Sequence, residues 1–124
     1  METTTTFQKW SAQLRKGYLE LCVLIVIQQK QSSYGLEVLQ TLEKAGLPIN
    51  EGTLYPLLNR MFKNNWLSSE WITPSEGGHP RRHYQLSDEG LKLLPQMIET
   101  FQNNAILHAT LTALLNGNDQ LRPI

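Results

Sequence analysis

The sequence predicts one mainly helical domain of the α+β class, in which three helices precede a two-stranded hairpin and one long final helix. Apolar residues recur at helical spacing in four segments, and a turn rich in glycine and proline joins two short runs of β-forming residues. With 124 residues, the chain has room for about one domain of the usual 150 residues. We therefore expect one domain over residues 1–86 and a C-terminal dimerisation helix with its tail over 87–124.

Composition narrows the possible functions. The chain is 40% hydrophobic and has no apolar run long enough for a membrane span, which favours a soluble protein with no membrane partner. Eleven basic and eleven acidic side chains give a formal charge of zero, so an anionic partner would have to meet a local patch. The single cysteine, Cys22, cannot form an internal disulfide, and the N-terminus does not resemble a secretion signal. We expect a cytoplasmic protein whose only thiol is buried and inert.

The first two helices are predicted over 8–29 and 33–45. The first has apolar residues at intervals of four, three and four: Leu14, Tyr18, Leu21 and Ile25. The second is expected to be capped by Ser32 or Ser33 and to end near Gly46 and Pro48.

The third helix is predicted to begin after Asn50, whose side chain is a good N-cap. Its buried stripe is Leu54, Leu57, Leu58, Met61 and Phe62. The opposite face is polar and becomes basic at its end: it carries Gly52, Pro56, Asn59, Arg60 and Lys63, with Thr53 and Tyr55 on its flanks. Pro56 predicts an irregular first turn.

The hairpin is predicted from strands at 67–72 and 81–86 around a turn at 73–80, with Trp66 and Trp71 in the core. Ser87 is expected to cap the final helix, Pro95 to bend it and Gly117 to follow its end. At 1.5 Å per residue, a helix of this extent is about 40 Å long, more than a small domain can cover by itself. Its apolar positions are Leu91, Leu94, Ile98, Phe101 and Ala105, followed in a shifted phase by Leu107, Leu111 and Leu114.

Three helices followed by a hairpin is the order of a winged helix-turn-helix, whose third helix enters the major groove of DNA. Cations lie on that helix and on the hairpin, where phosphates would be. Arg60 and Lys63 could instead simply solvate a surface helix, and Arg81 or Arg82 could pair with Glu70 or Glu76. His79 and His83 do not predict a metal site, because Pro80 between them disfavours the helix that such a spacing needs.

Three blocks of the sequence resemble the PadR family of bacterial transcriptional regulators. They are Tyr34-Gly35, the run from Glu51 to Arg60 (EGTLYPLLNR), and the run from Gly77 to Gly90 (GGHPRRHYQLSDEG). The resemblance covers residues 14–115. It implies a homodimeric winged-helix repressor, with the first and last helices in the dimer interface and, in some members, a small-molecule effector. Tyr34, Thr53 and Tyr55 match positions that the family uses to contact DNA, and Arg81 and Arg82 match its basic wing.

These arguments predict a sequence-specific, DNA-binding transcriptional regulator, a repressor released or modulated by a small molecule. As a homodimer, it would read a pseudo-palindromic operator in double-stranded DNA, with half-sites about 10 bp or a multiple apart. A winged-helix module for protein interaction, without DNA binding, is the alternative. No set of residues suggests an enzyme, a cofactor or a metal. The predicted DNA-binding residues are Tyr34, Thr53, Tyr55, Asn59, Arg60, Lys63, His79, Arg81 and Arg82.

A separate ligand site is predicted from two aromatic residues. Trp10 on the first helix and Phe101 on the last could line a groove of the dimer and stack on a flat aromatic effector. By resemblance, Phe101 lies near an aromatic ligand-stacking position of drug-binding relatives. Phe101 could equally be a seam residue that buries apolar area.

Overall fold

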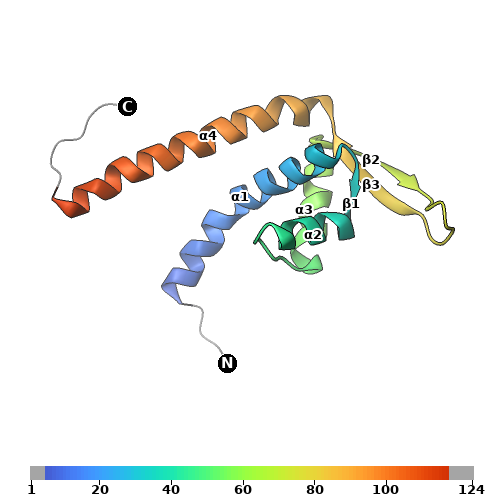
Figure 1. Ribbon diagram of the computed structural model, residues 1–124, viewed down its shortest axis with the longest axis horizontal. Coiled ribbons are helices and arrows are strands. Elements are labelled where there is room, and N and C mark those ends of the chain that lie inside the picture. The colour runs from blue at the N-terminus through green and yellow to red at the C-terminus, as the bar shows by residue number, and fades with distance from the viewer. Residues whose placement is uncertain (1–4, 118–124) are drawn as a thin grey trace. The chain divides into compact units, whose positions relative to one another are not determined.

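The computed structural model describes residues 5–117, and the chain divides after Leu94 into two compact units. The first unit contains α1 (Thr6–Lys30), β1 (Ser33–Tyr34), α2 (Gly35–Lys44), α3 (Glu51–Lys63), β2 (Leu67–Ile72), β3 (Arg81–Leu86) and the first turns of α4 (Asp88–Thr112). The second contains the rest of α4 and the short 3-10 helix η1 (Ala113–Asn116). Figure 1 shows the order of these elements, which confirms the predicted mainly helical winged-helix architecture.

The ends of the helices follow from local capping. Thr5 and Gln8 form a capping box at α1, and the Asn50 side chain accepts from the backbone N–H of Thr53 at 2.9 Å to begin α3, as predicted. Gly46, with φ +99°, follows the end of α2. The prediction of an irregular turn at Pro56 was wrong: α3 runs without interruption through this residue.

The sheet has one more strand than the sequence predicted. Its order is β1-β3-β2, with β3 antiparallel to both neighbours. Ser33 and Tyr34 form β1 opposite Tyr84 and His83, so the prediction that Ser32 or Ser33 caps α2 was wrong. The Ser33 hydroxyl instead donates to Oε1 of Glu37 at 2.6 Å, and α2 begins at Gly35 without a side-chain cap.

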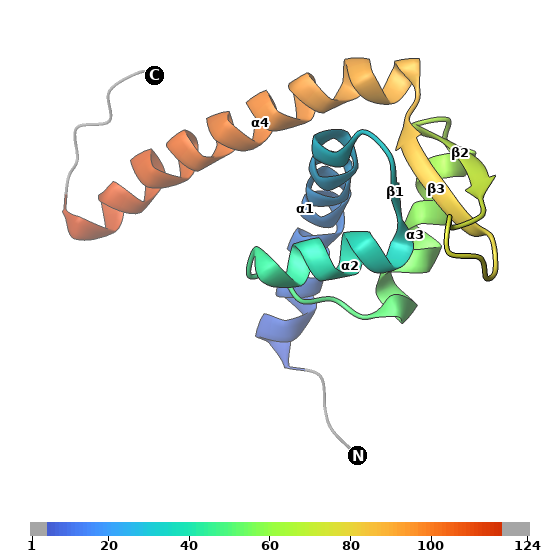
Figure 2. The ribbon, with the colours of Figure 1, turned by 45° about the vertical axis from the view of Figure 1, so that its right-hand side comes forward.

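The core of the first unit lies between the C-terminal half of α1, α2, α3 and the inner face of the sheet. The fully buried apolar side chains are Val23, Leu24, Ile27, Val38, Leu54, Leu58, Met61 and Leu67. The β2–β3 hairpin and its loop at 73–80, which we call the wing, extend beyond the helices (Figure 2). Trp71 on the wing is 69% exposed, so the prediction that it belongs to the core was wrong.

The base of the wing is joined tightly to the start of α4. Asn65 takes a left-handed conformation, φ +65°, and lets the chain turn from α3 into β2. The Ser87 hydroxyl donates to the carbonyl of Asn65 and accepts from the backbone N–H of Gly90. A Cβ at Gly90 would overlap the carbonyl oxygen of Trp66, so only glycine permits this approach.

The long final helix was predicted correctly in its start, although its last residues form η1 and not α-helix. α4 continues without a break through Pro95. In the second unit, the large apolar side chains of α4 and η1 are mostly exposed: Phe101, Ile106, Leu107, Leu111, Leu114 and Leu115. None of the described helices is both long and apolar enough to cross a membrane.

Gly90→Ala should destabilise the protein by about 1–3 kcal/mol, because the new methyl group meets backbone that cannot move aside. The midpoint of urea unfolding at one fixed protein concentration measures the change. Gly17→Ala is the matched control: a Cβ there has no atom within 4 Å, and alanine should stabilise α1 by about 0.5–1 kcal/mol. Equal midpoints for Gly90→Ala and the unmodified protein would contradict the tight junction.

Candidate nucleic-acid interface

The outward face of α3 is the first component of the candidate interface. Leu54, Leu57, Leu58 and Met61 are buried, whereas every position predicted to lie opposite them is exposed: Gly52, Pro56, Asn59, Arg60 and Lys63. Thr53 and Tyr55 are also exposed, on the two flanks. Phe62, predicted in the buried stripe, lies at its edge, where 36% of it is accessible. The helix therefore offers a hydrogen-bonding face that becomes basic toward its C-terminus.

Arg60 lies on the flank of α3 that faces α1. Its guanidinium is 3.7 Å from the carboxylate of Glu20, and its side chain remains 55% exposed. A solvent-exposed pair of this kind contributes about 0–1 kcal/mol, so an anionic partner could compete for Arg60.

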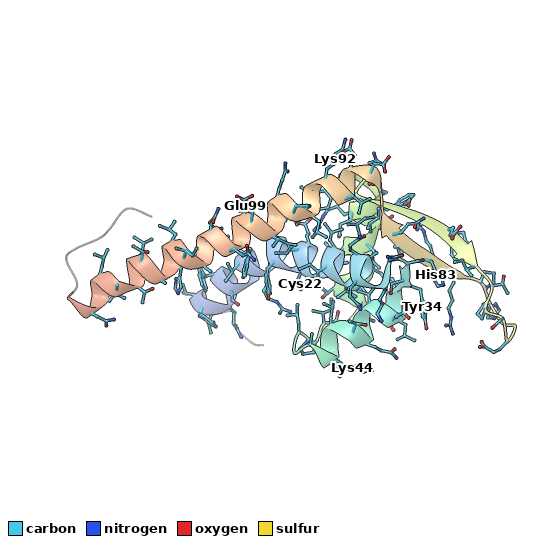
Figure 3. All side chains as sticks on the ribbon, turned by 45° about the horizontal axis from the view of Figure 1, so that its top comes forward. Cys22, Tyr34, Lys44, His83, Lys92 and Glu99 are labelled. Carbon is cyan, nitrogen blue, oxygen red and sulfur yellow. The ribbon has the colours of Figure 1, made fainter. Side chains whose placement is uncertain are left out.

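The wing places its two arginines on opposite faces of one strand, because successive side chains of a β-strand alternate. Arg81 is exposed, and its guanidinium carbon lies 4.6 Å from the centre of the Tyr34 ring. Tyr34 also contacts His83, with ring centres 5.2 Å apart, and Figure 3 shows these two residues next to each other at the base of the wing. Arg81 thus extends from an aromatic cluster toward solvent. His79 is exposed in the wing loop.

Arg82 faces the helices and is half-buried. Its guanidinium carbon lies 4.5 Å from the centre of the Phe62 ring on α3 and 5.1 Å from that of Tyr84 on β3. Its Nε–H donates to the Ser69 hydroxyl on β2 at 3.0 Å. The Arg82 side chain therefore contacts α3 and both strands of the wing.

In the part of the chain that the structure describes, the wing arginines form no ion pair with an acid. Across residues 5–117, no ion pair joins Arg81 or Arg82 to Glu70 or Glu76, the alternative partners considered from the sequence. The register explains Glu70: it lies opposite His83, whereas Trp71 lies opposite Arg82.

A hollow of about 400 Å³ opens between β1, the start of α2, α3 and the wing. Its walls include the rings of Tyr34, Tyr55, Trp71 and Tyr84 and the side chains of Arg81 and Arg82. Trp71 is the residue that sequence reasoning missed. Trp71 pairs with Arg82 across the hairpin, so the two side chains lie on the same face of the sheet. This could not be read from the sequence without knowing the pairing register of the strands.

Tyr55 is fixed in this hollow by a close backbone approach. A Cβ at Gly35 would lie 2.5 Å from Cε1 of the Tyr55 ring, so the ring packs directly on the glycine. Partial burial, followed by the nearby Glu51 carboxylate, raises the pKa of the Tyr55 phenol. The hydroxyl therefore remains protonated at neutral pH and can donate a hydrogen bond.

The predicted ligand residues lie in different units. Trp10 on α1 is 56% exposed and forms a tilted pair with Phe7, with ring centres 6.1 Å apart. Phe101 belongs to the second unit and is 48% exposed. The effector groove that would combine them stays a prediction.

Metal binding and thiol chemistry concern the other titratable side chains within residues 5–117. Among the described residues, no group of three or more His, Cys, Asp or Glu side chains could hold a metal ion. Cys22 is half-buried, and burial raises the pKa of its thiol, although a hydrogen bond with Tyr18 opposes this shift. The thiol is therefore protonated and poorly nucleophilic at neutral pH.

Comparison with known proteins places this geometry in a family. The model of the transcriptional regulator PadR-like family matches residues 23–96. A transcriptional regulator from Streptococcus is 34% identical, with 81% of this chain and 97% of that chain covered and a TM-score of 0.73. A PadR family transcriptional regulator from Eggerthella lenta is 31% identical, with 90% of this chain and 94% of that chain covered and a TM-score of 0.70. A PadR-like transcriptional regulator from Bacillus cereus is 34% identical, with 83% of this chain and 96% of that chain covered and a TM-score of 0.68.

No curated protein sequence matches the chain significantly. The family match includes α2, α3 and the whole wing, and the solved relatives cover between 81% and 90% of the chain. These relatives are described as transcriptional regulators, the class of protein that the sequence predicted. The chain belongs to the PadR-like family of transcriptional regulators.

Proposed function

We propose that this protein is a sequence-specific DNA-binding repressor that acts as a homodimer. The observation that supports it most directly is the combination of an exposed polar face on α3 with an arginine of the wing that has no acidic partner among the described residues. A negative backbone is attracted to such a local patch even though the whole chain has zero net charge.

Base readout is assigned to the exposed face of α3. Asn59 lies near the centre of that face, and its amide can accept from the N6 amino group and donate to N7 of an adenine at the same time. Thr53, near the N-terminus of the helix, would approach a base edge or the nearest phosphate. In this arrangement α3 lies in the major groove as the recognition helix.

Phosphate contacts are assigned to groups around that helix. Arg81 and Lys63 supply charge, and Arg60 adds to it when it leaves Glu20. Tyr34 and Tyr55 would donate phenolic hydrogen bonds to the DNA backbone, and His79 of the wing loop would contact it too.

Arg82 has a different role in this proposal. Its contacts with Phe62, Tyr84 and Ser69 fix the wing against α3, so Arg82 acts through the position of Arg81 and not as a free phosphate ligand. A planar guanidinium can stack on two rings and donate from Nε at once, which a lysine ammonium cannot do.

The dimer would be formed by the apolar faces of the first and last helices. On α1, exposed large side chains recur at helical spacing: Phe7, Trp10 and Leu14, with Ile25 further along. In the second unit, α4 and η1 expose the leucines at 107, 111, 114 and 115. Exposed apolar patches of this extent are typical of interaction sites, and a second copy covers both in a symmetric pair.

A small molecule would modulate repression by favouring one separation of the two recognition helices. A flat aromatic effector between Trp10 and Phe101 would act in this way only if its affinity differs between the two arrangements.

Arg81→Ala should weaken binding to every DNA sequence and make the plot of log K against log salt shallower by about 0.9 for each phosphate that the protein no longer neutralises. Arg82→Lys keeps the charge but removes the stacked geometry, so affinity should fall about tenfold while the salt slope stays unchanged. Fluorescence anisotropy with a labelled duplex, measured from about 50 to 200 mM salt, separates the two effects. An unchanged slope for Arg81→Ala would refute its phosphate contact.

A gel shift against random duplex at low salt tests the proposed function as a whole. Nonspecific binding that weakens with added salt is expected from the cationic patch. A complete absence of binding would favour the alternative, a winged-helix module for protein interaction.

Leu111→Glu should convert the dimer into a monomer of 14.2 kDa, because each partner would then bury an unpaired carboxylate. Gln102→Glu is the control, since it adds the same charge at an exposed position on the opposite side of α4 and should leave the dimer intact. Sedimentation equilibrium at matched concentrations distinguishes them. A monomeric unmodified protein, or equal dissociation of both variants, would count against the proposed interface.

A further inference from the structure

The basic end of α3 is paired with an acid from another helix. Although the chain has eleven acidic and eleven basic side chains, residues 5–117 contain a single ion pair. In this pair, Oε2 of Glu20 on α1 lies 3.7 Å from Nη2 of Arg60 on α3. The one acid of α3 itself, Glu51, lies in the first turn of the helix. Glu20 is therefore the acid that acts on the C-terminal end of α3.

The two partners of this pair differ in exposure. The Glu20 side chain is 19% exposed, whereas that of Arg60 is 55% exposed. Glu20 lies between Leu19 and Leu21, which are both buried, so the packing of α1 holds the carboxylate in place. A carboxylate that is largely removed from water is costly to leave without a cation. The fixed acid therefore draws the longer, more exposed arginine toward α1.

The alternatives open to each partner also differ. Lys16 lies one helical turn before Glu20 on α1, at a spacing that lets side chains meet, yet in the described part of the chain it forms no ion pair with Glu20. Arg60, in contrast, has Lys63 three positions later on α3, and two neighbouring cations attract a phosphate together. Departure of Arg60 would leave Glu20 without its ionic partner, and this cost opposes the gain from a phosphate.

We propose that Glu20 is a specificity-determining residue, which withholds Arg60 from loosely bound DNA. The proposal rests on the proposed function, in which α3 is the recognition helix. A nonspecific complex depends almost entirely on phosphate charge. In such a complex, a phosphate that water separates from Arg60 competes poorly with a carboxylate at 3.7 Å, because Coulomb attraction falls with distance and with the dielectric of water.

The balance changes when α3 is seated in the major groove of its own site. Phosphates on the groove edge then contact the flanks of the helix directly, and Arg60 exchanges the carboxylate for a phosphate. Glu20 thus lowers the affinity for nonspecific DNA more than the affinity for the operator. This difference matters because a regulator must find its site among a large excess of nonspecific sequence.

Glu20→Gln tests the proposal, since it keeps the shape of the side chain and removes its charge. We expect affinity for a labelled duplex of random sequence to rise about three- to fivefold, and its plot of log K against log salt to steepen by about 0.9 as Arg60 gains a phosphate. For the duplex selected from a random pool, affinity should rise less than about twofold with an unchanged slope, because Arg60 already contacts DNA there. Fluorescence anisotropy measures both affinities.

Two controls isolate the action through Arg60. In an Arg60→Gln background, Glu20→Gln should lose its effect, because no cation remains to be released. Glu99→Gln removes the same charge from an exposed position on α4 and should leave both affinities unchanged (Figure 3). Matching urea midpoints verify folding of each variant. An unchanged affinity for random duplex, equal gains for both duplexes, or the same gain in the Arg60→Gln background would overturn the proposal.

Retention on heparin, a sulfated polyanion without bases, separates this proposal from the proposed function. Glu20→Gln should elute at higher salt than the unmodified protein and Glu99→Gln, because the released arginine adds to the cationic patch. If this shift occurs in a protein that binds no DNA, the restraint on Arg60 stands and the proposed function is refuted. DNA binding that Glu20→Gln leaves unaffected for both duplexes refutes the role of Glu20 and leaves the proposed function in place.

Discussion

The contact between the wing and α3 is the interaction on which the candidate interface depends. Arg82 lies between the rings of Phe62 and Tyr84 and is tied to the Ser69 hydroxyl, so it links the helix to both strands of the wing. At the base of the hairpin, the approach of Gly90 to the Trp66 carbonyl fixes where β2 begins and β3 ends. A two-stranded hairpin alone is marginally stable in water, so these contacts decide whether the wing has a defined direction.

With the wing held in place, a chain of zero net charge acquires a local positive surface. Arg81 leans on Tyr34 from the outer face of β3, while Lys63 and Asn59 extend from α3. Within the described part of the chain, Glu20 on α1 forms an ion pair with Arg60, on the flank of α3 that faces α1. DNA can be attracted to this surface because basic and acidic side chains lie on different parts of the molecule, although the net charge of the chain is zero.

The sequence predicted the helices and the hairpin because their signals are local. Apolar periodicity and the Asn50 cap act within a few residues of the chain, and both were confirmed. β1 was missed because two residues have no detectable alternation and become a strand only by pairing with β3. Trp71 was misjudged for a related reason, since the face that a strand residue occupies depends on the pairing register.

Selection of bound duplexes from a random pool tests the central claim most directly, because it requires no knowledge of the regulated gene. A symmetric pair of recognition helices, each positioned by its wing, predicts enrichment of an inverted repeat whose half-sites are separated by about one helical turn, 10 bp, or a multiple of it. Enrichment of no sequence, or of a single site without twofold symmetry, would contradict the account.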